Sequence, residues 1–261
     1  MPRALGQGVG RRAYAEIVAA GGYPDARERS DVRRGRFFSS YLDTVIERDL
    51  RSLAQVHDQA SVRQLMLALA AMSSSLLNID GLARDLGLPA STVRAHAALL
   101  ETLFLVQRLP AWSTNLLSRT IKTPKVFVTD SGLLCHLGGA NAERLGNDGN
   151  LAGAAFETFV TTELLRQAQW QLDVPRAFHC RDRDGREVDI VFERRGSAVA
   201  GVEIKAAASV TARDFRGLAH LRDKLGDRFK LGVVLYTGQQ PLPFGDRLAA
   251  VPNSGLWSAA S

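Results

Sequence analysis

The clearest pattern in the sequence is an alternation of apolar and polar residues in two short neighbouring segments. In the first segment Glu187, Asp189 and Val191 share one face, and in the second Glu203 and Lys205 do so. Successive side chains of a β-strand point to opposite faces, so a period of two is typical of a strand that is buried on one side. We therefore predict two half-buried strands.

The loop between these strands decides which residues lie opposite one another. Residues 193–200 join the strands and have Gly196 near their centre, which is typical of a hairpin turn. A loop with an even number of residues would pair Asp189 with Val202, whereas an odd number pairs it with Glu203 and matches the apolar faces. We predict an odd loop, with two carboxylates side by side.

Two neighbouring carboxylates need a cation, because without one the pKa of at least one of them rises. Lys205 is one candidate and a divalent metal ion is another. An Asp followed on the next strand by Glu-x-Lys resembles the motif of the PD-(D/E)xK nucleases, which have the restriction-endonuclease-like fold. The resemblance implies that Asp189 and Glu203 hold Mg²⁺. It also implies that Lys205 orients or deprotonates the attacking water, since phosphodiester hydrolysis needs charge neutralisation and a hydroxide-like nucleophile.

A helix before the sheet often supplies a further acid in that superfamily. Residues 151–160 are predicted to form such a helix, with Glu157 in its first half. Glu187 shares the face of Asp189 and could take the place of Glu157. The alternative to a catalytic site is a solvated hairpin face on which opposite charges pair across the strands.

The order of the expected elements supports the resemblance to this fold. Further apolar and helical patterns surround the two strands, and together they give the succession α-β-β-β-α-β that the fold requires. The segments concerned are a helix at 151–160, a strand at 177–181, the two strands above, a helix at 211–225 and a strand at 231–236. We therefore predict an α/β domain of the restriction-endonuclease-like class over residues 151–261.

Residues 61–137 resemble a winged helix-turn-helix. Their apolar spacing predicts helices at 62–76 and 80–86 and a third helix that Ser91 caps, with strands at 105–109 and 126–129 as the wing. The positions expected to face inward on the third helix are Val93, Ala97, Leu100 and Phe104.

DNA binding by this domain would use exposed side chains of the third helix and cations of the wing. The expected contacts are Ser91, Thr92, Arg94 and His96 on the helix, and Arg119, Lys122 and Lys125 toward the second wing strand. Many winged helices only hold proteins together, so a role in protein contacts remains the alternative.

The other segments carry no chemical motif. Residues 1–60 are expected to be helical, and their apolar stripe at 38–50 either mediates association, including formation of a homo-oligomer, or is covered by residues 61–76. Residues 138–150 contain several Gly and Asn and are predicted to be a linker between the winged helix and the nuclease-like domain.

Composition limits the class of protein. A chain of 261 residues that is 46% hydrophobic has room for two ordinary domains with cores of their own. The longest apolar run is too short to span a bilayer and a signal peptide is not recognisable, so we expect a soluble cytoplasmic protein without membrane contact. The two cysteines provide no disulfide framework. A net charge of +6 permits nucleic-acid binding without establishing it.

Several short motifs together resemble a family of prokaryotic AAA-type ATP-binding proteins. They are residues 21–24 (GGYP), 41–50 (YLDTVIERDL) and 125–134 (KVFVTDSGLL), in combination with Glu157, Asp189 and Glu203-Ile204-Lys205. The resemblance implies an ATPase, a winged helix and a C-terminal domain of unknown function with a nuclease-like core. The sequence contains no Gly-x-x-x-x-Gly-Lys-Ser/Thr motif, however, so we expect no ATP binding. An ATPase supplied by another chain is one explanation, and residues 1–20 would then be a remnant of the missing lid.

Two classes of function follow. In the first, the protein is a Mg²⁺-dependent nuclease to which the winged helix delivers DNA, with Asp189 and Glu203 as metal ligands, Lys205 activating water and Glu157 completing the site. In the second, it is a non-catalytic DNA- or protein-binding regulatory module whose nuclease-like domain is structural.

Overall fold

The structure of the protein is a computed structural model that describes residues 10–49, 58–115, 119, 122–182, 184–195 and 198–257. Two compact units can be distinguished in it. Residues 1–14, 110–122 and 160–261 form one, which we call the sheet unit, and residues 15–109 and 123–159 form the other, which we call the helical unit. Residues 1–9, the first part of the expected lid remnant at residues 1–20, lie outside the described residues.

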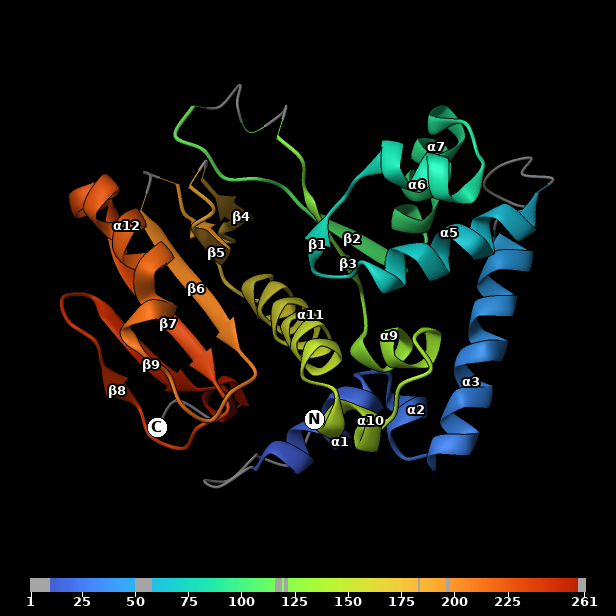
Figure 1. The fold of residues 1–261 in the computed structure, drawn as a ribbon, viewed down its shortest axis with the longest axis horizontal. Coiled ribbons are helices and arrows are strands. Elements are labelled where there is room, and N and C mark those ends of the chain that lie inside the picture. The colour runs from blue at the N-terminus through green and yellow to red at the C-terminus, as the bar shows by residue number, and fades with distance from the viewer. Residues whose placement is uncertain are drawn as a thin grey trace. The chain divides into compact units, whose positions relative to one another are not determined.

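The helical unit combines short helices with a small sheet (Figure 1). Its helices are α1 (Arg11–Ala20, which begins in the sheet unit), α2 (Pro24–Arg27), α3 (Asp31–Thr44), the π-helix η1 (Val45–Asp49), α5 (Gln59–Ala71), α6 (Ile79–Leu86), α7 (Ala90–Thr102), α9 (Ser131–Leu137) and α10 (Ala142–Asn147). Its strands are β1 (Ser75–Leu76), β2 (Val106–Leu109) and β3 (Lys125–Val128). They form an antiparallel sheet of order β1-β3-β2.

The predicted helices and wing strands of residues 61–129 are all present, but some of their boundaries differ. Leu76 belongs to strand β1 rather than to the preceding helix. Helix α7 begins at Ala90 after Pro89, so the prediction that Ser91 caps it is wrong. Phe104 lies beyond the end of α7 at a φ of 55° and is 79% exposed, so its predicted inward orientation is wrong as well.

The apolar stripe expected at residues 38–50 is covered within the helical unit. Phe38, Leu42 and Ile46 are buried, and η1 packs against α5. Two ion pairs support this contact, because Arg63 of α5 binds Asp43 at 2.7 Å and Glu47 at 3.5 Å. The stripe is therefore covered partly by residues 61–76, through the contact of η1 with α5, and partly by Tyr23 and by His136 of α9, which pack against Phe38.

The segment expected to be a linker, residues 138–150, is largely helical. It contains α10 and the first residues of α11 (Gly149–Ala168), a helix of 20 residues that runs from the helical unit into the sheet unit. Asn141 caps α10, since its side chain accepts a hydrogen bond from the backbone N–H of Arg144 at 2.9 Å. Asn141 therefore begins a helix, and most of the segment has regular secondary structure.

The sheet unit is built around a mixed sheet of six strands (Figure 1). Its strands are β4 (Arg176–Arg181), β5 (Glu187–Glu193), β6 (Val199–Lys205), β7 (Phe229–Tyr236), β8 (Leu242–Pro243) and β9 (Leu248–Pro252), in the order β4-β5-β6-β7-β9-β8. Its other helices are η2 (Ala212–Phe215), α12 (Arg216–Leu225), η3 (Gly226–Arg228) and η4 (Asn253–Trp257). The succession α11-β4-β5-β6-α12-β7 is the one that the sequence predicts.

The hairpin between β5 and β6 has the predicted odd loop. Glu193 pairs with Val199, and the backbone N–H of Arg194 donates to the carbonyl of Ala198 at 3.0 Å. Strands β4 to β6 are antiparallel, whereas β6, β7 and β9 run parallel. Gly196, at the centre of the predicted turn, lies outside the described residues.

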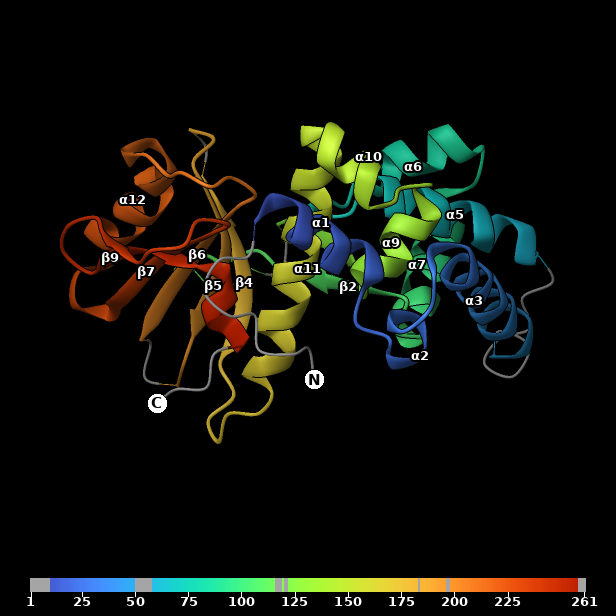
Figure 2. The same ribbon diagram turned by 90° about the horizontal axis from the view of Figure 1, so that it is seen from below.

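Helix α12 covers one face of the sheet (Figure 2). Its residues Leu218, Leu221 and Leu225 form a buried cluster with side chains of β5, β6 and β7, among them Val188 and Phe229. At the other end of the unit, Trp257 of η4 donates a hydrogen bond to Glu163 of α11 at 3.1 Å. Strand β5, which was expected to be half-buried, is buried at five of its seven residues.

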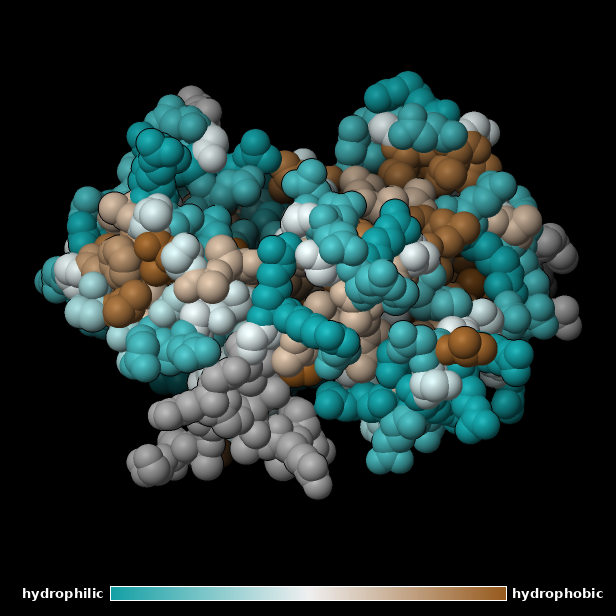
Figure 3. Space-filling view, turned by 60° about the horizontal axis from the view of Figure 1, so that its bottom comes forward, coloured by the Kyte–Doolittle hydropathy of each residue, from teal (hydrophilic) through white to brown (hydrophobic). Residues whose placement is uncertain are grey.

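Two surface properties complete the description of the fold. None of the described helices is long and apolar enough to cross a membrane. Figure 3 shows a surface that is hydrophilic over most of the visible face, with separate apolar areas. Large apolar side chains that are exposed include Phe104, Trp170 and Leu172.

Candidate functional site

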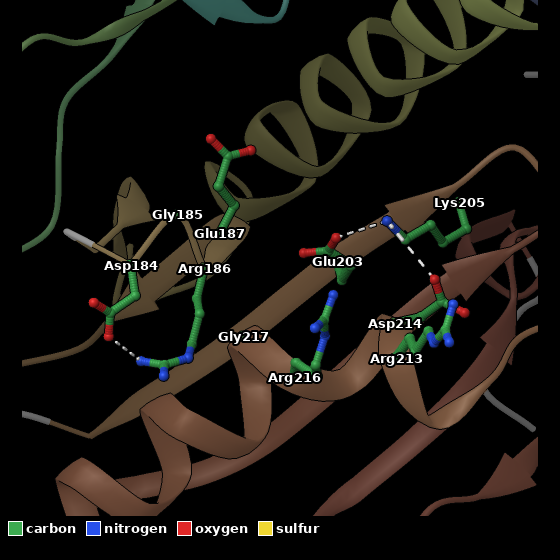
Figure 4. Close-up of a pocket in the computed structure, with 10 residues that line it drawn as sticks. All are labelled: Asp184, Gly185, Arg186, Glu187, Glu203, Lys205, Arg213, Asp214, Arg216 and Gly217. Carbon is green, nitrogen blue, oxygen red and sulfur yellow. Dashed lines mark hydrogen bonds and ion pairs between the residues drawn. The ribbon is translucent and has the colours of Figure 1, made fainter.

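A polar pocket of about 470 Å³ lies in the sheet unit where β6 meets the start of helix α12 (Figure 4). Its lining is almost entirely charged. The residues are Asp184, Gly185, Arg186, Glu187, Glu203, Lys205, Arg213, Asp214, Arg216 and Gly217. Two of the three residues of the predicted Asp and Glu-x-Lys motif, Glu203 and Lys205, thus lie in one pocket.

Glu203 and Lys205 reach the pocket because alternate residues of β6 face helix α12. A side chain at Gly201 would touch Leu218 of α12, and Val199 belongs to the buried cluster beneath the same helix. Two and four residues further along β6, Glu203 and Lys205 lie on the same face. There the facing residues are Arg213 and Asp214 of η2 and Arg216 at the start of α12, so the buried cluster gives way to a polar pocket.

A glycine brings the first turn of α12 close to the sheet. A Cβ atom at Gly217 would collide with the backbone carbonyl of Glu187 in β5. Any larger residue would push this turn of the helix outward, and the pocket wall formed by Arg216 would move with it. Gly217 is therefore a structural requirement of the pocket.

Strand β5 is irregular at Asp189. Phe178 pairs with Val191 and Cys180 with Val188, so two residues of β5, Asp189 and Ile190, lie opposite the single residue His179 of β4. This is a β-bulge, which changes the alternation of side chains along a strand. Val188 and Val191 consequently lie in the same buried cluster. The prediction that Val191 shares the polar face is wrong for this reason.

The bulge turns the carboxylate of Asp189 toward strand β6. Asp189 is 7% exposed, and its Oδ2 accepts a hydrogen bond from the backbone N–H of Ile204 at 2.9 Å. The regular pairing of β5 with β6 ends at Ile190 and Val202. Continued by one step, the same register would set Asp189 opposite Glu203, the pair that the odd loop predicts.

Lys205 joins the acids of the site. Its ammonium lies 2.9 Å from Oε1 of Glu203 and 3.9 Å from Oδ1 of Asp214 (Figure 4). Burial by itself lowers the pKa of Lys205, but the charges of Glu203, Asp189 and Asp214 outweigh this effect, so the pKa is raised above its ordinary value. Lys205 is accordingly a cation at neutral pH.

Asp214 is held in place by its own helix turn. Its Oδ2 accepts hydrogen bonds from the backbone N–H of Thr211 at 2.8 Å and from the Thr211 hydroxyl at 3.1 Å, which completes a capping box at the start of η2. The sequence analysis did not single out Asp214, Arg213 or Arg216. The Thr-x-x-Asp pattern that follows the Glu-x-Lys strand is the signal that could have located this turn.

The two motif carboxylates have the chemistry of ligands for a hard divalent cation. Mg²⁺ commonly binds through one or two carboxylates and keeps several water molecules. Asp189 and Glu203 match this requirement, although the part of the chain that the structure describes contains no group of three or more His, Cys, Asp or Glu residues arranged to hold a metal ion. Asp189 and Glu203 are thus the residues of this site that could hold such an ion.

Glu157 lies in the helical unit, where it is engaged by a lysine. The ammonium of Lys125, which is 5% exposed, binds Oε1 of Glu157 at 2.8 Å. The exposed wing cation predicted at Lys125 is therefore buried, because strand β3 is covered along its whole length. In the sheet unit, Glu187 lines the pocket and pairs with Arg181 at 3.1 Å.

Arg119 is also buried, although it was predicted to be a wing cation. Its guanidinium binds both carboxylate oxygens of Glu193, at 2.5 Å and 3.0 Å, and lies over the rings of Trp112 and Phe178. These hydrogen bonds lower the pKa of Glu193 below its ordinary value, against the opposing effect of burial. Arg119 therefore serves the core of the sheet unit, and Lys122 is the exposed cation of this segment.

The segment that carries Arg119 extends the sheet at β4. Ala111 forms a parallel bridge with His179, whose backbone N–H donates to the carbonyl of Pro110 at 2.9 Å and whose carbonyl accepts from Trp112 at 2.6 Å. His179 is the residue opposite the bulge at Asp189. The segment thus pairs with the outer edge of β4, the strand that lies next to β5 and its Asp189.

The third helix of the predicted winged helix-turn-helix presents fewer polar side chains than expected. Ser91 and Arg94 are exposed and Thr92 is partly exposed. His96 is 8% exposed, so its predicted exposure is wrong. Its Nδ1 lies 3.4 Å from the hydroxyl of Ser61 on helix α5. Position 96 faces inward because it lies one turn after the buried Val93.

Comparisons with known proteins identify relatives without naming a function. The chain is 28% identical over 256 residues to "Uncharacterized protein Rv2008c" of Mycobacterium tuberculosis. The aligned region covers 97% of this chain and 56% of that protein. The same values hold for "Uncharacterized protein Mb2031c" of Mycobacterium bovis. An "Uncharacterized protein" of Haemophilus influenzae is 23% identical over 217 residues, 81% of this chain and 50% of that protein. The chain therefore spans about half the length of the curated relatives it matches. No solved structure matches the chain significantly.

Two family models match successive parts of the sequence. A domain of unknown function (DUF4143) matches residues 152–256, and a second domain of unknown function (DUF8612) matches residues 11–144. Because the latter covers just over half of the 261 residues, the chain belongs to the family defined by the domain of unknown function DUF8612.

Proposed function

We propose that the protein is a Mg²⁺-dependent nuclease whose active site is the polar pocket of the sheet unit. The observation that carries this proposal is the placement of Glu203 and Lys205 side by side in the pocket, with the bulge at Asp189 turning a third charged group toward the same strand. Clusters in which a cation is surrounded by several acids in a concave site are typical of catalytic centres.

Asp189 and Glu203 are the residues that would hold the metal ion. Bound there, Mg²⁺ would neutralise charge on a phosphodiester and lower the pKa of a coordinated water molecule. The hydrogen bond from Ile204 to Asp189 fixes the direction of one carboxylate before any ion binds. Neither candidate for a third acid is assigned, since Glu187 lines the pocket but pairs with Arg181, and Glu157 is engaged by Lys125 in the helical unit.

Lys205 would act as a hydrogen-bond donor. Without a metal ion, the charges of Glu203, Asp189 and Asp214 raise its pKa, so its ammonium is protonated at neutral pH and can donate. An ammonium in this position can orient the attacking water and stabilise the negative charge that develops on the phosphate oxygens. Asp214 contributes by holding the same ammonium from the opposite side.

The remaining parts of the chain fit a DNA-processing protein. The succession α11-β4-β5-β6-α12-β7 is similar to the core of the restriction-endonuclease-like fold. Helices α5, α6 and α7 with the sheet of β1 to β3 are arranged like a winged helix, which would contact DNA through Ser91, Thr92, Arg94 and Lys122. We further propose that the chain binds no ATP itself and cooperates with an ATPase from another chain, as the resemblance to AAA-type proteins implies.

A non-catalytic regulatory module is the second candidate. One observation favours it: Arg119 and Lys125, two of the three expected wing cations, are buried in ion pairs and cannot contact phosphate. Arg94 also lies 3.7 Å from Asp80, which reduces the positive charge of the third helix. The winged helix would then bind protein, and the nuclease-like unit would be structural.

Cleavage of DNA in the presence of Mg²⁺ or Mn²⁺ separates the two candidates. Plasmid and single-stranded DNA are incubated with the intact chain, with Asp189→Asn, with Lys205→Ala and with Lys230→Ala, which removes an exposed lysine of β7 outside the pocket. The nuclease proposal expects metal-dependent cleavage that Lys230→Ala retains and the other two variants lose. Absence of cleavage by the folded intact chain with either metal would support the regulatory module instead.

A further inference from the structure

Two arginines of the pocket lack the acidic partners that its other charged groups have. Each carboxylate that lines the pocket is paired with a cation: Asp184 with Arg186, Glu187 with Arg181, and both Glu203 and Asp214 with Lys205. Within the described residues, no ion pair or side-chain hydrogen bond is formed by Arg213 or Arg216. Both are exposed to solvent. The pocket thus contains two guanidinium groups that internal ion pairs do not explain.

These two arginines have a fixed relation to the motif residues. They lie on either side of Asp214, which the capping box holds and which faces the ammonium of Lys205. A spacing of three residues in a helical turn places Arg213 and Arg216 on neighbouring positions of one surface. The close approach at Gly217 keeps this turn against β5. In Figure 4, Arg216 extends from the first turn of α12 toward Glu203.

We propose that Arg213 and Arg216 form a subsite for a nucleic-acid backbone phosphate adjacent to the one that is hydrolysed. This inference rests on the proposed nuclease function and adds the part of the substrate that the pocket recognises. Guanidinium groups match the geometry of phosphate oxygens through paired N–H donors and stay charged at any physiological pH. The reacting phosphate would lie at Lys205, Glu203 and Asp189, and the neighbouring phosphate of the same strand at the two arginines.

The subsite has a consequence for the kind of substrate. Contacts to phosphate position a strand without reading its bases, so recognition in this pocket is independent of base sequence. It requires a polynucleotide with at least two consecutive phosphates. A small phosphodiester that has a single phosphate can occupy the reacting position and leaves the subsite empty.

The test combines a binding measurement with hydrolysis of two substrates. Binding of a fluorescein-labelled single-stranded 20-nucleotide DNA is followed by fluorescence anisotropy in Ca²⁺ at several salt concentrations, after the DNA has been checked for integrity. Hydrolysis of the same DNA and of bis(p-nitrophenyl) phosphate, which has no neighbouring phosphate, is followed in Mg²⁺. The proteins are the intact chain, the double variant Arg213→Ala/Arg216→Ala, the double variant with lysine at both positions, and Lys224→Ala as a control on the last turn of the same helix.

The alanine double variant is expected to bind DNA about tenfold more weakly, because it loses charge-assisted hydrogen bonds. The slope of log affinity against log salt concentration should become less negative by about 0.7 for each phosphate contact that the variant loses. KM for DNA should rise, whereas hydrolysis of bis(p-nitrophenyl) phosphate stays unchanged. The lysine variant should recover part of the affinity, and Lys224→Ala should behave like the intact chain.

Two results would overturn the subsite. Unchanged DNA affinity and salt dependence in the alanine variant would show that the arginines do not contact the backbone. Equal loss of activity on DNA and on bis(p-nitrophenyl) phosphate would place them in the hydrolytic step or in folding. Failure of the nuclease proposal would give a result distinct from both of these. None of the proteins would then hydrolyse either substrate, but the intact chain and the alanine variant would still differ in DNA affinity by anisotropy. The arginines would then remain a phosphate-binding site.

Discussion

Asp130 joins two parts of the chain that are 108 residues apart, because its Oδ2 accepts a hydrogen bond from the backbone N–H of Gly22 at 2.6 Å. Its Oδ1 accepts another from Leu133 at 2.9 Å and so caps helix α9. The backbones meet so closely that a side chain at Gly132 would collide with the carbonyl of Ala20. The GGYP and TDSGLL motifs therefore form one structural clamp in the helical unit.

Replacement of Asp130 by alanine should weaken this clamp. Asp130 is 3% exposed, and the variant loses a helix cap and a second charge-assisted hydrogen bond in a buried setting. We expect the free energy of unfolding of the helical unit to fall by about 2–4 kcal/mol. Urea unfolding followed by circular dichroism measures it. Asp148→Ala removes an exposed cap of α11 and should cost about 1 kcal/mol. Equal losses in the two variants would contradict the clamp.

The buried pair of Arg119 and Glu193 should be a major determinant of stability in the sheet unit. Replacing Arg119 by methionine leaves the carboxylate of Glu193 without its main partner, which costs roughly 3–5 kcal/mol. Arg228 is 40% exposed and lies 3.4 Å from the same carboxylate, so Arg228→Met should cost less than about 1 kcal/mol. Urea unfolding followed by tryptophan fluorescence distinguishes the variants. A small effect of Arg119→Met would mean that the ring contacts, not the charge, hold this segment.

The same pair predicts how stability changes in acid. The pKa of Glu193 is lowered by the hydrogen bonds from Arg119, so its contribution is fully present above the ordinary value of 4.5 and is lost as pH falls through the lower value of the folded state. The stability difference between the intact chain and Glu193→Gln should therefore be largest near neutral pH and shrink below about pH 4.5. A difference that is constant from pH 7 to pH 3 would show that charge at Glu193 does not contribute.

The contribution of Lys205 to stability changes with pH in the opposite direction to that of Glu193, because it is lost at high pH. Its pKa is raised above 10.5, so its attraction to Glu203, Asp189 and Asp214 stabilises the fold at neutral pH and is lost as pH rises through the raised value. The stability difference between the intact chain and Lys205→Met should thus be constant from pH 7 to pH 9 and change only above about pH 10.5. A change centred near pH 8 would mean that Lys205 titrates early enough to serve as a general base, against the proposed role.

Two glycine substitutions should have opposite effects. Gly217→Ala introduces a methyl group that meets the carbonyl of Glu187, which should cost about 1–3 kcal/mol and displace the first turn of α12. Gly153 lies in helix α11 with open space around its Cα, so Gly153→Ala should be neutral or stabilising by up to about 1 kcal/mol. Thermal unfolding of both variants measures the contrast. A tolerated Gly217→Ala would mean that α12 can move without cost.

The sequence predicts local patterns well where one physical rule dominates. The helix predicted at 62–76 and the odd loop after Glu193 follow from burial and strand pairing alone. Both appear in the structure, with the helix at Gln59–Ala71. The bulge at Asp189 could not be predicted, because it depends on how β4 pairs with β5 and leaves no signature in β5 itself. For the same reason the predicted face of Val191 was wrong.

The candidate site was predicted in part. Glu203 and Lys205 could be placed together because they are two residues apart on one strand. Arg119 and Lys125 looked like surface cations, since a sequence shows charge but not the acid that will bury it. The contribution of Asp214, Arg213 and Arg216 depends on the contact of α12 with β5, which arises from tertiary packing around Gly217.

The segment at residues 110–122 has a consequence for how the protein can be divided. It lies between β2 and β3 of the helical unit and within the part matched by the DUF8612 model, yet it belongs to the sheet unit, where it pairs with β4 and supplies the partner of Glu193. A fragment that begins at residue 151 would therefore expose the edge of β4 and leave a buried acid without its arginine. The division between the two matched domains of unknown function therefore does not coincide with the division between the two structural units.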